Sequence, residues 1–283
     1  MKTTSEPQYN LTGRIARGVE RIRVGKGRTG IERVEVQIGH GGFSPHRHDT
    51  YAIGLTFSGV QTFHYRGTRR YCLPRQCHVL HPDEIHDGVA SDDAGFGYRI
   101  LYVAPTALQT ALDGAPLPFV ADPIVTPGSD FTELMFRLWD IGDDLDDVDD
   151  DEIILSILEF LHTLSGTSFK GRRSGIPWQA LSRVRELLNE EPVVRCAAKQ
   201  LEEISGLDRW TLSREFRAAY GTSPRSFRTM RQLDKVRSLL LRGASAADAA
   251  AEAGFSDQSH MSRMFKRTYG CTPMQWLEAV RQI

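Results

Sequence analysis

Residues 252–273 read EAGFSDQSHMSRMFKRTYGCTP, and residues 204–224 read ISGLDRWTLSREFRAAYGTSP. The two stretches repeat one pattern, which starts with a glycine and an apolar residue and ends in Tyr-Gly-x-x-Pro. Gly206 corresponds to Gly254 at an offset of 48 residues, whereas the phenylalanines and prolines that follow are 49 residues apart. The second copy therefore has one extra residue near the start of its second helix. This repeat decides the fold of the C-terminal part.

Each copy has the parts of a helix-turn-helix unit. A first helix ends at the glycine, which adopts the left-handed backbone conformation at low cost. An apolar residue then anchors the turn, and a polar residue caps the second helix; we expect Asp208 to be this cap in the first copy and Ser256 in the second. The side chains predicted to face outward from the second helices are Arg209, Trp210, Ser213, Arg214, Gln258, Ser259, Ser262 and Arg263.

These outward side chains suit the reading of double-stranded DNA. Arginine makes two hydrogen bonds to guanine in the major groove, and glutamine does the same with adenine. A helix over residues 224–242, capped by Ser223 and ended by Gly243, is predicted to join the copies, so that the two reading helices enter successive major grooves ~34 Å apart. Five further cations are predicted to neutralise phosphates: Arg217, Arg225, Arg228, Lys266 and Arg267.

The charge distribution supports this division. The whole chain has a net charge of −1, but residues 1–169 carry 15 basic and 24 acidic side chains, and residues 170–283 carry 20 and 12. The two parts thus have net charges of −9 and +8. A basic C-terminal part beside an acidic N-terminal part indicates a nucleic-acid-binding module joined to a module with another task.

The composition excludes several other classes of protein. An apolar share of 40% with 25% charged residues excludes wholesale disorder. No run approaches the ~18 apolar residues of a membrane-spanning helix, and residues 1–6 lack the apolar core of a signal peptide. We therefore expect a cytoplasmic protein without membrane contact. The four cysteines form no C-x-x-C pair and are expected to be reduced, mostly buried thiols.

The N-terminal part is predicted to be a β-barrel followed by helices. Residues 14–103 show apolar residues at every second position between glycine-rich turns, which is typical of many short strands. The period then becomes helical, with helices predicted from Ser129 and over residues 150–164. The expected fold is α+β with two domains. We divide the chain into a cupin-like barrel (1–104), a helical coupling and dimerisation segment (105–164), a linker (165–177) and an all-helical domain (178–283).

The C-terminal motif Gly-Phe-x-Asp-x-Ser-His-x-x-Arg-x-Phe-Lys, followed by Tyr-Gly-x-Thr-Pro, resembles the DNA-binding domain of AraC/XylS-type transcriptional regulators. The likeness extends from about residue 178 to residue 276. It implies an effector-controlled transcriptional regulator. We expect a homodimer that works with RNA polymerase, as an activator or as a repressor. The likeness also implies the major-groove readers Trp210, Ser213, Arg214, Ser259, Ser262 and Arg263. Glu202 departs from the pattern, because the family has a small residue there, as Ala250 is in the second copy.

Histidines gather in the predicted barrel, where seven of the nine fall between residues 40 and 86. They include His46 and His48 within Pro-His-Arg-His, and His86 at the end of Pro-Asp-Glu-Ile-His. These motifs resemble the effector-binding cupin domain of the same family. Our preferred interpretation is a metal-free effector pocket. The residues expected to line or close it are His46, His48, Tyr51, Phe63 and His86.

Two alternatives stay open. Three imidazoles from His46, His48 and His86 would suit a divalent metal, but the glutamate that metal-binding cupins carry four or five residues after the second histidine is replaced by Ala52 and Ile53. A bound metal would favour a cupin enzyme, of dioxygenase or isomerase type, tethered to a DNA-binding module. A barrel that serves only for dimerisation is the third possibility. Because we find no nucleophile–base set, phosphate loop or carboxylate pair, we predict a regulator without a catalytic site or cofactor.

Overall fold

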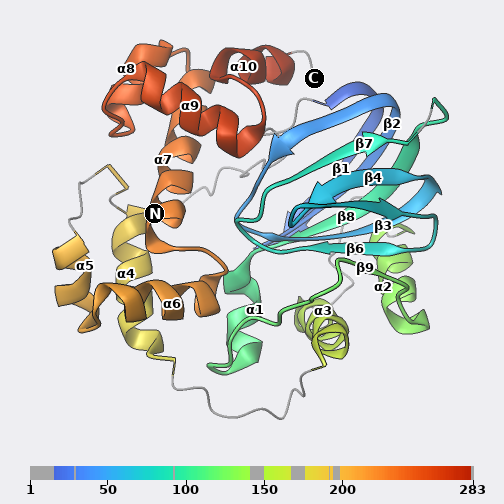
Figure 1. The fold of residues 1–283 in the computed structure, drawn as a ribbon, viewed down its shortest axis with the longest axis horizontal. Coiled ribbons are helices and arrows are strands. Elements are labelled where there is room, and N and C mark those ends of the chain that lie inside the picture. The colour runs from blue at the N-terminus through green and yellow to red at the C-terminus, as the bar shows by residue number, and fades with distance from the viewer. Residues whose placement is uncertain are drawn as a thin grey trace.

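A computed structural model gives the arrangement of the chain. It describes residues 16–28, 30–91, 93–140, 150–166, 176–190, 192–193 and 198–281. An antiparallel barrel-like sheet with helices beneath it forms the N-terminal part, and helices alone form the C-terminal part (Figure 1). The predicted fold class is confirmed. Of the predicted linker, residues 167–175 lie outside the described residues.

The strands of the described chain form one sheet that curls on itself. Its order is β5-β4-β7-β2-β8-β3-β6-β9, with β1 paired to β2, and the end strands β5 and β9 lie against each other. The strands are β1 (Ala16–Arg28), β2 (Ile31–His46), β3 (Tyr51–Gly59), β4 (Gln61–Tyr65), β5 (Thr68–Cys72), β6 (Cys77–Leu80), β7 (His86–Ala90), β8 (Phe96–Val103) and β9 (Ile124–Val125).

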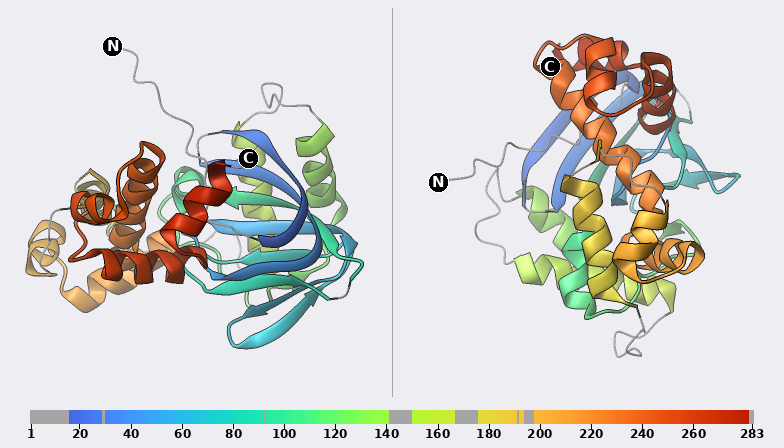
Figure 2. Two further views of the ribbon diagram at one scale, coloured as in Figure 1. Left: turned by 90° about the horizontal axis from the view of Figure 1, so that it is seen from above. Right: turned by 90° about the vertical axis from the view of Figure 1, so that its left-hand side faces the viewer.

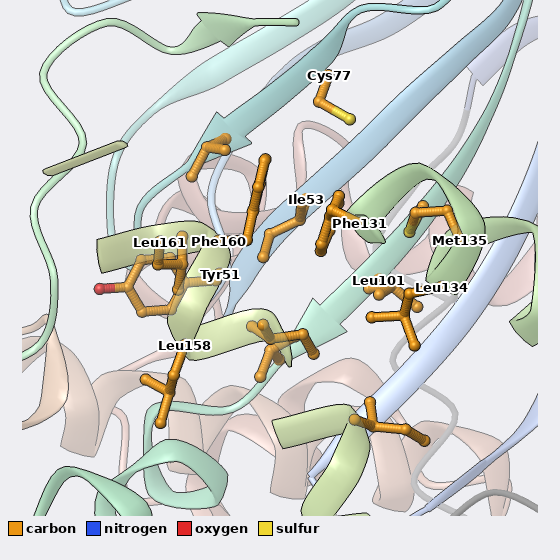
Figure 3. Packing of buried hydrophobic residues seen from close by; sticks show 14 of the residues in the cluster. Tyr51, Ile53, Cys77, Leu101, Phe131, Leu134, Met135, Leu158, Phe160 and Leu161 are labelled. Atoms are coloured by element: carbon orange, nitrogen blue, oxygen red, sulfur yellow. The ribbon is translucent and has the colours of Figure 1, made fainter. Parts of the chain in front are cut away.

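Alternation along the strands divides their side chains between two faces. On β3, Ala52 faces the barrel interior with Phe63, Tyr98 and other apolar residues. Its neighbours Tyr51 and Ile53 face the opposite way, into a second cluster formed with the helices (Figure 3). The barrel therefore has an enclosed interior and an outer face that the helices cover.

Three helices follow the strands and cover that outer face: α1 (Pro105–Leu112), α2 (Ser129–Asp140) and α3 (Asp150–Ser165). The rings of Phe131 on α2 and Phe160 on α3 stack with centroids 3.7 Å apart. The helices predicted from Ser129 and over residues 150–164 are thus present. The buried guanidinium of Arg33 donates to the carbonyl of Leu138, near the end of α2, and attaches this helix to the sheet.

The C-terminal part contains the two predicted helix-turn-helix units around a long connector (Figure 2). Its helices are α4 (Trp178–Glu190), α5 (Ala198–Ser205), α6 (Arg209–Tyr220), α7 (Pro224–Leu241), α8 (Ala246–Glu252), α9 (Gln258–Tyr269) and α10 (Pro273–Arg281). Each unit has its own apolar cluster, and α7 contributes to both. No helix among the described residues is both long and apolar enough to cross a membrane.

The helix caps confirm one sequence prediction and correct another. Asp208 caps α6 by accepting hydrogen bonds from the backbone N–H groups of Trp210 and Thr211. The predicted cap Ser256 is wrong: Asp257 caps α9 and accepts from the backbone N–H of His260. The extra residue of the second copy shifts the start of its helix by one position. Hydrogen bonds from Thr211 hold the pKa of Asp208 below its ordinary value, and the bond from His260 does the same for Asp257.

Candidate DNA-reading surface and histidine cluster

The residues predicted to read DNA lie on the exposed sides of α6 and α9. Trp210 is 75% exposed at the start of α6, and the guanidinium of Arg209 lies 4.9 Å from its ring centroid. Arg214 is also exposed, although its guanidinium pairs with Glu215 at 2.8 Å. Ser213 and Ser262 are half-buried, whereas Gln258, Ser259 and Arg263 are exposed on α9. A helix that exposes large apolar and cationic side chains to solvent is typical of a binding surface.

The five cations predicted to contact phosphates are not equivalent. Arg217, Arg225, Lys266 and Arg267 are exposed. Arg228 is half-buried, and its guanidinium donates to the backbone carbonyls of Pro192 at 2.8 Å and Val193 at 3.3 Å. Through these bonds Arg228 connects α7 to the segment before α5. We therefore leave it out of the set of residues proposed to contact phosphates.

Glu202, the residue that departs from the family pattern, has a defined role in the first unit. Its carboxylate accepts a hydrogen bond of 2.9 Å from the backbone N–H of Arg209, at the start of α6. Asp208 accepts from the next two N–H groups, so three of the four N–H groups that a helix start leaves without helical partners are satisfied. Glu202 thus stabilises the start of the first reading helix.

Three imidazoles meet at the end of the barrel that faces the helical domain. His46 ends β2, His48 follows it, and His86 begins β7 opposite His46 in the sheet register. The ring centroids of His46 and His48 lie 4.4 and 4.8 Å from that of His86. All three residues are buried, and the ring of Tyr102 packs edge-on against His48 with the centroids 5.3 Å apart. The predicted histidine cluster is therefore assembled in space.

Hydrogen bonds set the proton position on each ring. Nδ1 of His46, His48 and His86 lies 2.8–2.9 Å from the carbonyl oxygens of Ser44, Thr50 and Glu84, respectively. A carbonyl only accepts, so Nδ1 carries the proton in each ring. A neutral ring accepts from a hydroxyl, and a protonated ring donates to a carboxylate.

The structure contradicts the prediction that Tyr51 belongs to this pocket. Its side chain lies among the helix-facing residues (Figure 3). Its hydroxyl donates to the carbonyl of Pro118 at 2.7 Å. On a strand, odd and even positions face opposite ways. On β3, Ala52 and every second residue from it face the interior. Tyr51 is adjacent to Ala52 and therefore faces the helices. Phe63, the other aromatic residue expected in the pocket, faces the interior.

One interior histidine was missed by sequence reasoning. His78 on β6 is 1% exposed, and its ring centroid lies 5.7 Å from Phe63 and 5.9 Å from Tyr98. Gly54 lies opposite on β3, where a Cβ atom would approach the His78 ring to 2.1 Å. Glycine at position 54 therefore gives the imidazole its space. The signal in the sequence was the alternation of β6, which places residue 78 on the same face as residue 80.

Histidine and cysteine side chains also bear on the alternative of a metal centre. Across the part of the chain that the structure describes, no group of three or more His, Cys, Asp or Glu side chains is arranged to hold a metal ion. Cys72, Cys77 and Cys271 are buried thiols, and burial raises the pKa of Cys72 to about 11. The remaining cysteine, Cys196, lies outside the described residues.

Comparisons with known proteins agree with this geometry. Residues 29–174 match the AraC-like ligand-binding domain, and residues 201–279 match a helix-turn-helix domain. YbfI, an HTH-type transcriptional regulator of Bacillus subtilis, is 26% identical over 226 residues, which cover 77% of this chain and 81% of YbfI. VirF, a virulence regulon transcriptional activator of Yersinia enterocolitica, is 41% identical over 71 residues, which cover 25% of this chain and 26% of VirF.

The solved structures show the same fold. The crystal structure of ToxT from Vibrio cholerae with a bound unsaturated fatty acid has a TM-score of 0.62 at 13% identity, over 89% of this chain and 96% of ToxT. The fold and the two sites thus define a regulator of transcription, with an N-terminal ligand-binding domain and a C-terminal helix-turn-helix DNA-binding domain. The chain belongs to the AraC family of transcriptional regulators.

Proposed function

We propose that the protein binds duplex DNA by placing α6 and α9 in successive major grooves. The observation that carries this proposal is the exposure of most of the predicted readers on both helices. Cations also lie in the last turn of each helix: Arg217 on α6, and Lys266 and Arg267 on α9. In this arrangement Arg209, Trp210, Ser213 and Arg214 read one element, and Gln258, Ser259, Ser262 and Arg263 read the other. Arg217, Arg225, Lys266 and Arg267 contact phosphates.

Replacing Arg263 by alanine tests the base-reading role. The full-length protein first selects its site from random duplexes. Against that site, Arg263→Ala should lose ~1–3 kcal/mol of binding free energy and relax the base preference at one position. The matched control is Lys266→Ala, which should weaken binding to all sequences alike and reduce the salt dependence. An Arg263→Ala protein that selects the same sequence with unchanged affinity would remove Arg263 from the reading set.

We further propose that the histidine cluster binds the polar group of a small-molecule effector. The preferred ligand has a carboxylate or hydroxyl group next to an apolar portion. The imidazoles of His46, His48 and His86 contact the polar group, and Phe63, with the other interior aromatic residues, packs against the apolar portion. The fatty acid bound to ToxT, which shares the fold, supports a ligand of this kind. No metal is needed for this binding.

A thermal-shift screen tests the effector site. Fatty acids, aromatic acids, sugars, amines and amino acids are the probes, and a stabilising ligand should raise the Tm of the wild-type protein. The His46→Ala/His48→Ala double variant should lose that shift. His64→Ala is the matched control, because the His64 side chain is 62% exposed and bonds to Asp87 outside the cluster. A stoichiometric divalent metal that co-purifies with the wild type and disappears in the double variant would contradict the metal-free site.

Membership of the AraC family supports a proposal for the oligomeric state of the protein and for its action on transcription. We propose a cytoplasmic homodimer that dimerises through the helices over residues 105–164 and activates transcription by contacting RNA polymerase. Because the relatives that match the chain are transcriptional regulators, we propose that the barrel binds its ligand without converting it. The oligomeric state is measured by light scattering of the full-length protein.

A further inference from the structure

Both helix-turn-helix units touch the barrel at equivalent positions. Gly221 ends α6 and Gly270 ends α9, and both have left-handed backbones, with φ of 73° and 76°. A Cβ atom on Gly221 would lie 2.7 Å from Pro82, and one on Gly270 would lie 3.1 Å from Ser44. The barrel therefore contacts the C-terminal ends of the two reading helices and leaves their starts exposed. In Figure 1 this is the end of the barrel that faces α6, α7 and α9.

Two barrel segments make these contacts, and we call them together the barrel mouth: residues 44–50 and residues 81–86. The first segment contacts the second unit, because the backbone N–H of Arg47 donates to the carbonyl of Thr268 at 2.8 Å. The second segment contacts the first unit, because the Thr222 hydroxyl donates to the Asp83 carboxylate at 2.8 Å. Each reading helix is thus attached to a different segment of the mouth.

The connector helix is attached as well. Asp49, in the first segment of the mouth, accepts a hydrogen bond from the guanidinium of Arg231 on α7. Arg231 also pairs with Asp234 on its own helix at 3.1 Å. The side chains of Arg231 and Asp49 are 22% and 17% exposed, so solvent screens this ion pair less than a surface pair.

The two segments of the mouth are also bonded to each other. The Arg47 guanidinium pairs with the Asp83 carboxylate at 3.0 Å, and the backbone N–H of Asp83 donates to the carbonyl of His48 at 2.7 Å. Asp83 therefore bonds to both the first segment and the first unit. The histidine cluster spans the same junction, since His46 and His48 belong to the first segment and His86 to the second.

We propose that the barrel mouth holds the two reading helices at a fixed spacing and thereby sets the distance between the two DNA elements that the protein accepts. This inference rests on the proposed function of α6 and α9. Trp210 and Arg263 are exposed while the mouth is bound, so the docked arrangement leaves both helices accessible to DNA. A ligand at the histidine cluster would act on this spacing, because it would bind across the junction of the two segments.

The experiment measures spacing preference with the full-length protein. Duplexes carry the two selected elements at their native separation or moved by one or two base pairs. The wild type should bind the altered duplexes about 10- to 100-fold more weakly, the penalty of a mismatched site. The Asp49→Asn/Asp83→Asn variant removes the carboxylates that bond to Arg231, Arg47 and Thr222, and its spacing penalty should fall to a few-fold. Asp87→Asn is the matched control, since Asp87 bonds to His64 on the outside of the barrel.

Binding to a duplex with a single element separates spacing from folding. The double variant should bind one element as well as the wild type does, and Thr222→Val, a milder change, should show a smaller relaxation in the same direction. A double variant that keeps the full wild-type penalty would overturn the inference, as would one that loses single-element binding. A wild-type protein that binds no selected duplex would overturn the proposed function itself.

Discussion

Replacing Phe265 by alanine is expected to lower the free energy of unfolding of the second helix-turn-helix unit by about 3–5 kcal/mol. Phe265 on α9 is completely buried. Its ring packs edge-on against Tyr269 and Trp276, with centroids 4.7 and 5.9 Å away. Alanine would leave a cavity where three aromatic rings meet, within the apolar cluster that the reading helix shares with the connector. Urea unfolding followed by tryptophan fluorescence measures the loss.

The repeat supplies a matched comparison. Phe216 is the equivalent residue of the first unit, is also completely buried, and packs against Tyr220 and Phe227. Phe216→Ala should destabilise the first unit by a similar amount and spare the second. Phe136→Ala is the surface control: the ring is 49% exposed, and its removal should change stability by less than about 1 kcal/mol. A Phe265→Ala protein as stable as this control would contradict the packing described here.

Acid is expected to destabilise the barrel through His81. Burial is the largest cause that lowers the pKa of His81, to about 4. Nε2 of this ring lies 3.1 Å from the backbone nitrogen of Val120 and 3.2 Å from its carbonyl oxygen. The neutral ring accepts from the N–H; a protonated ring would donate to the carbonyl, a contact that opposes the lowering of the pKa and is outweighed by burial. The unfolded chain, with an ordinary pKa of about 6.5, therefore binds more protons between pH 6.5 and 4. Stability rises with pH across this window, and His81 alone should remove about 2 kcal/mol between pH 7 and 5.

The difference between two pH profiles isolates this contribution. The free energy of unfolding is measured from pH 7 to pH 5 for the wild type and for His81→Gln, whose amide oxygen can accept from Val120 but does not titrate. The variant should lose less stability than the wild type as the pH falls. Parallel profiles would show that His81 titrates alike in the folded and unfolded chain, against the buried acceptor seen here.

Sequence patterns predicted the structural features that are determined by residues adjacent in the chain. The turn glycines, the cap at Asp208 and the connector helix each follow from a few adjacent residues. The cap of α9 was misplaced by one position, because Ser256 and Asp257 are both good caps and the extra residue decides between them. Tyr51 was misassigned because an aromatic residue suits either face of a covered strand. Only the register of β3 with its neighbours shows which face is the interior.

The contacts between the barrel and the helical domain could not be predicted from local patterns. Thr222 lies 139 residues from Asp83 along the chain, and Arg231 lies 182 residues from Asp49. Nothing in the sequence around either residue indicates its partner. His78 was missed for a related reason: its place in the interior depends on the space that Gly54 leaves on another strand.

The segment from residue 46 to residue 49 has two functions that alternate along the chain. His46 and His48 join the imidazole cluster, whereas Arg47 and Asp49 bond outward to Asp83 and Arg231. The number of residues in this segment is therefore more constrained than the identity of each residue. Deleting one residue would move this segment relative to the partners on both sides and would disrupt the imidazole cluster and the domain contact together. A substitution at one of these positions can therefore alter the imidazole cluster or the domain contact alone, whereas an insertion or deletion would alter both.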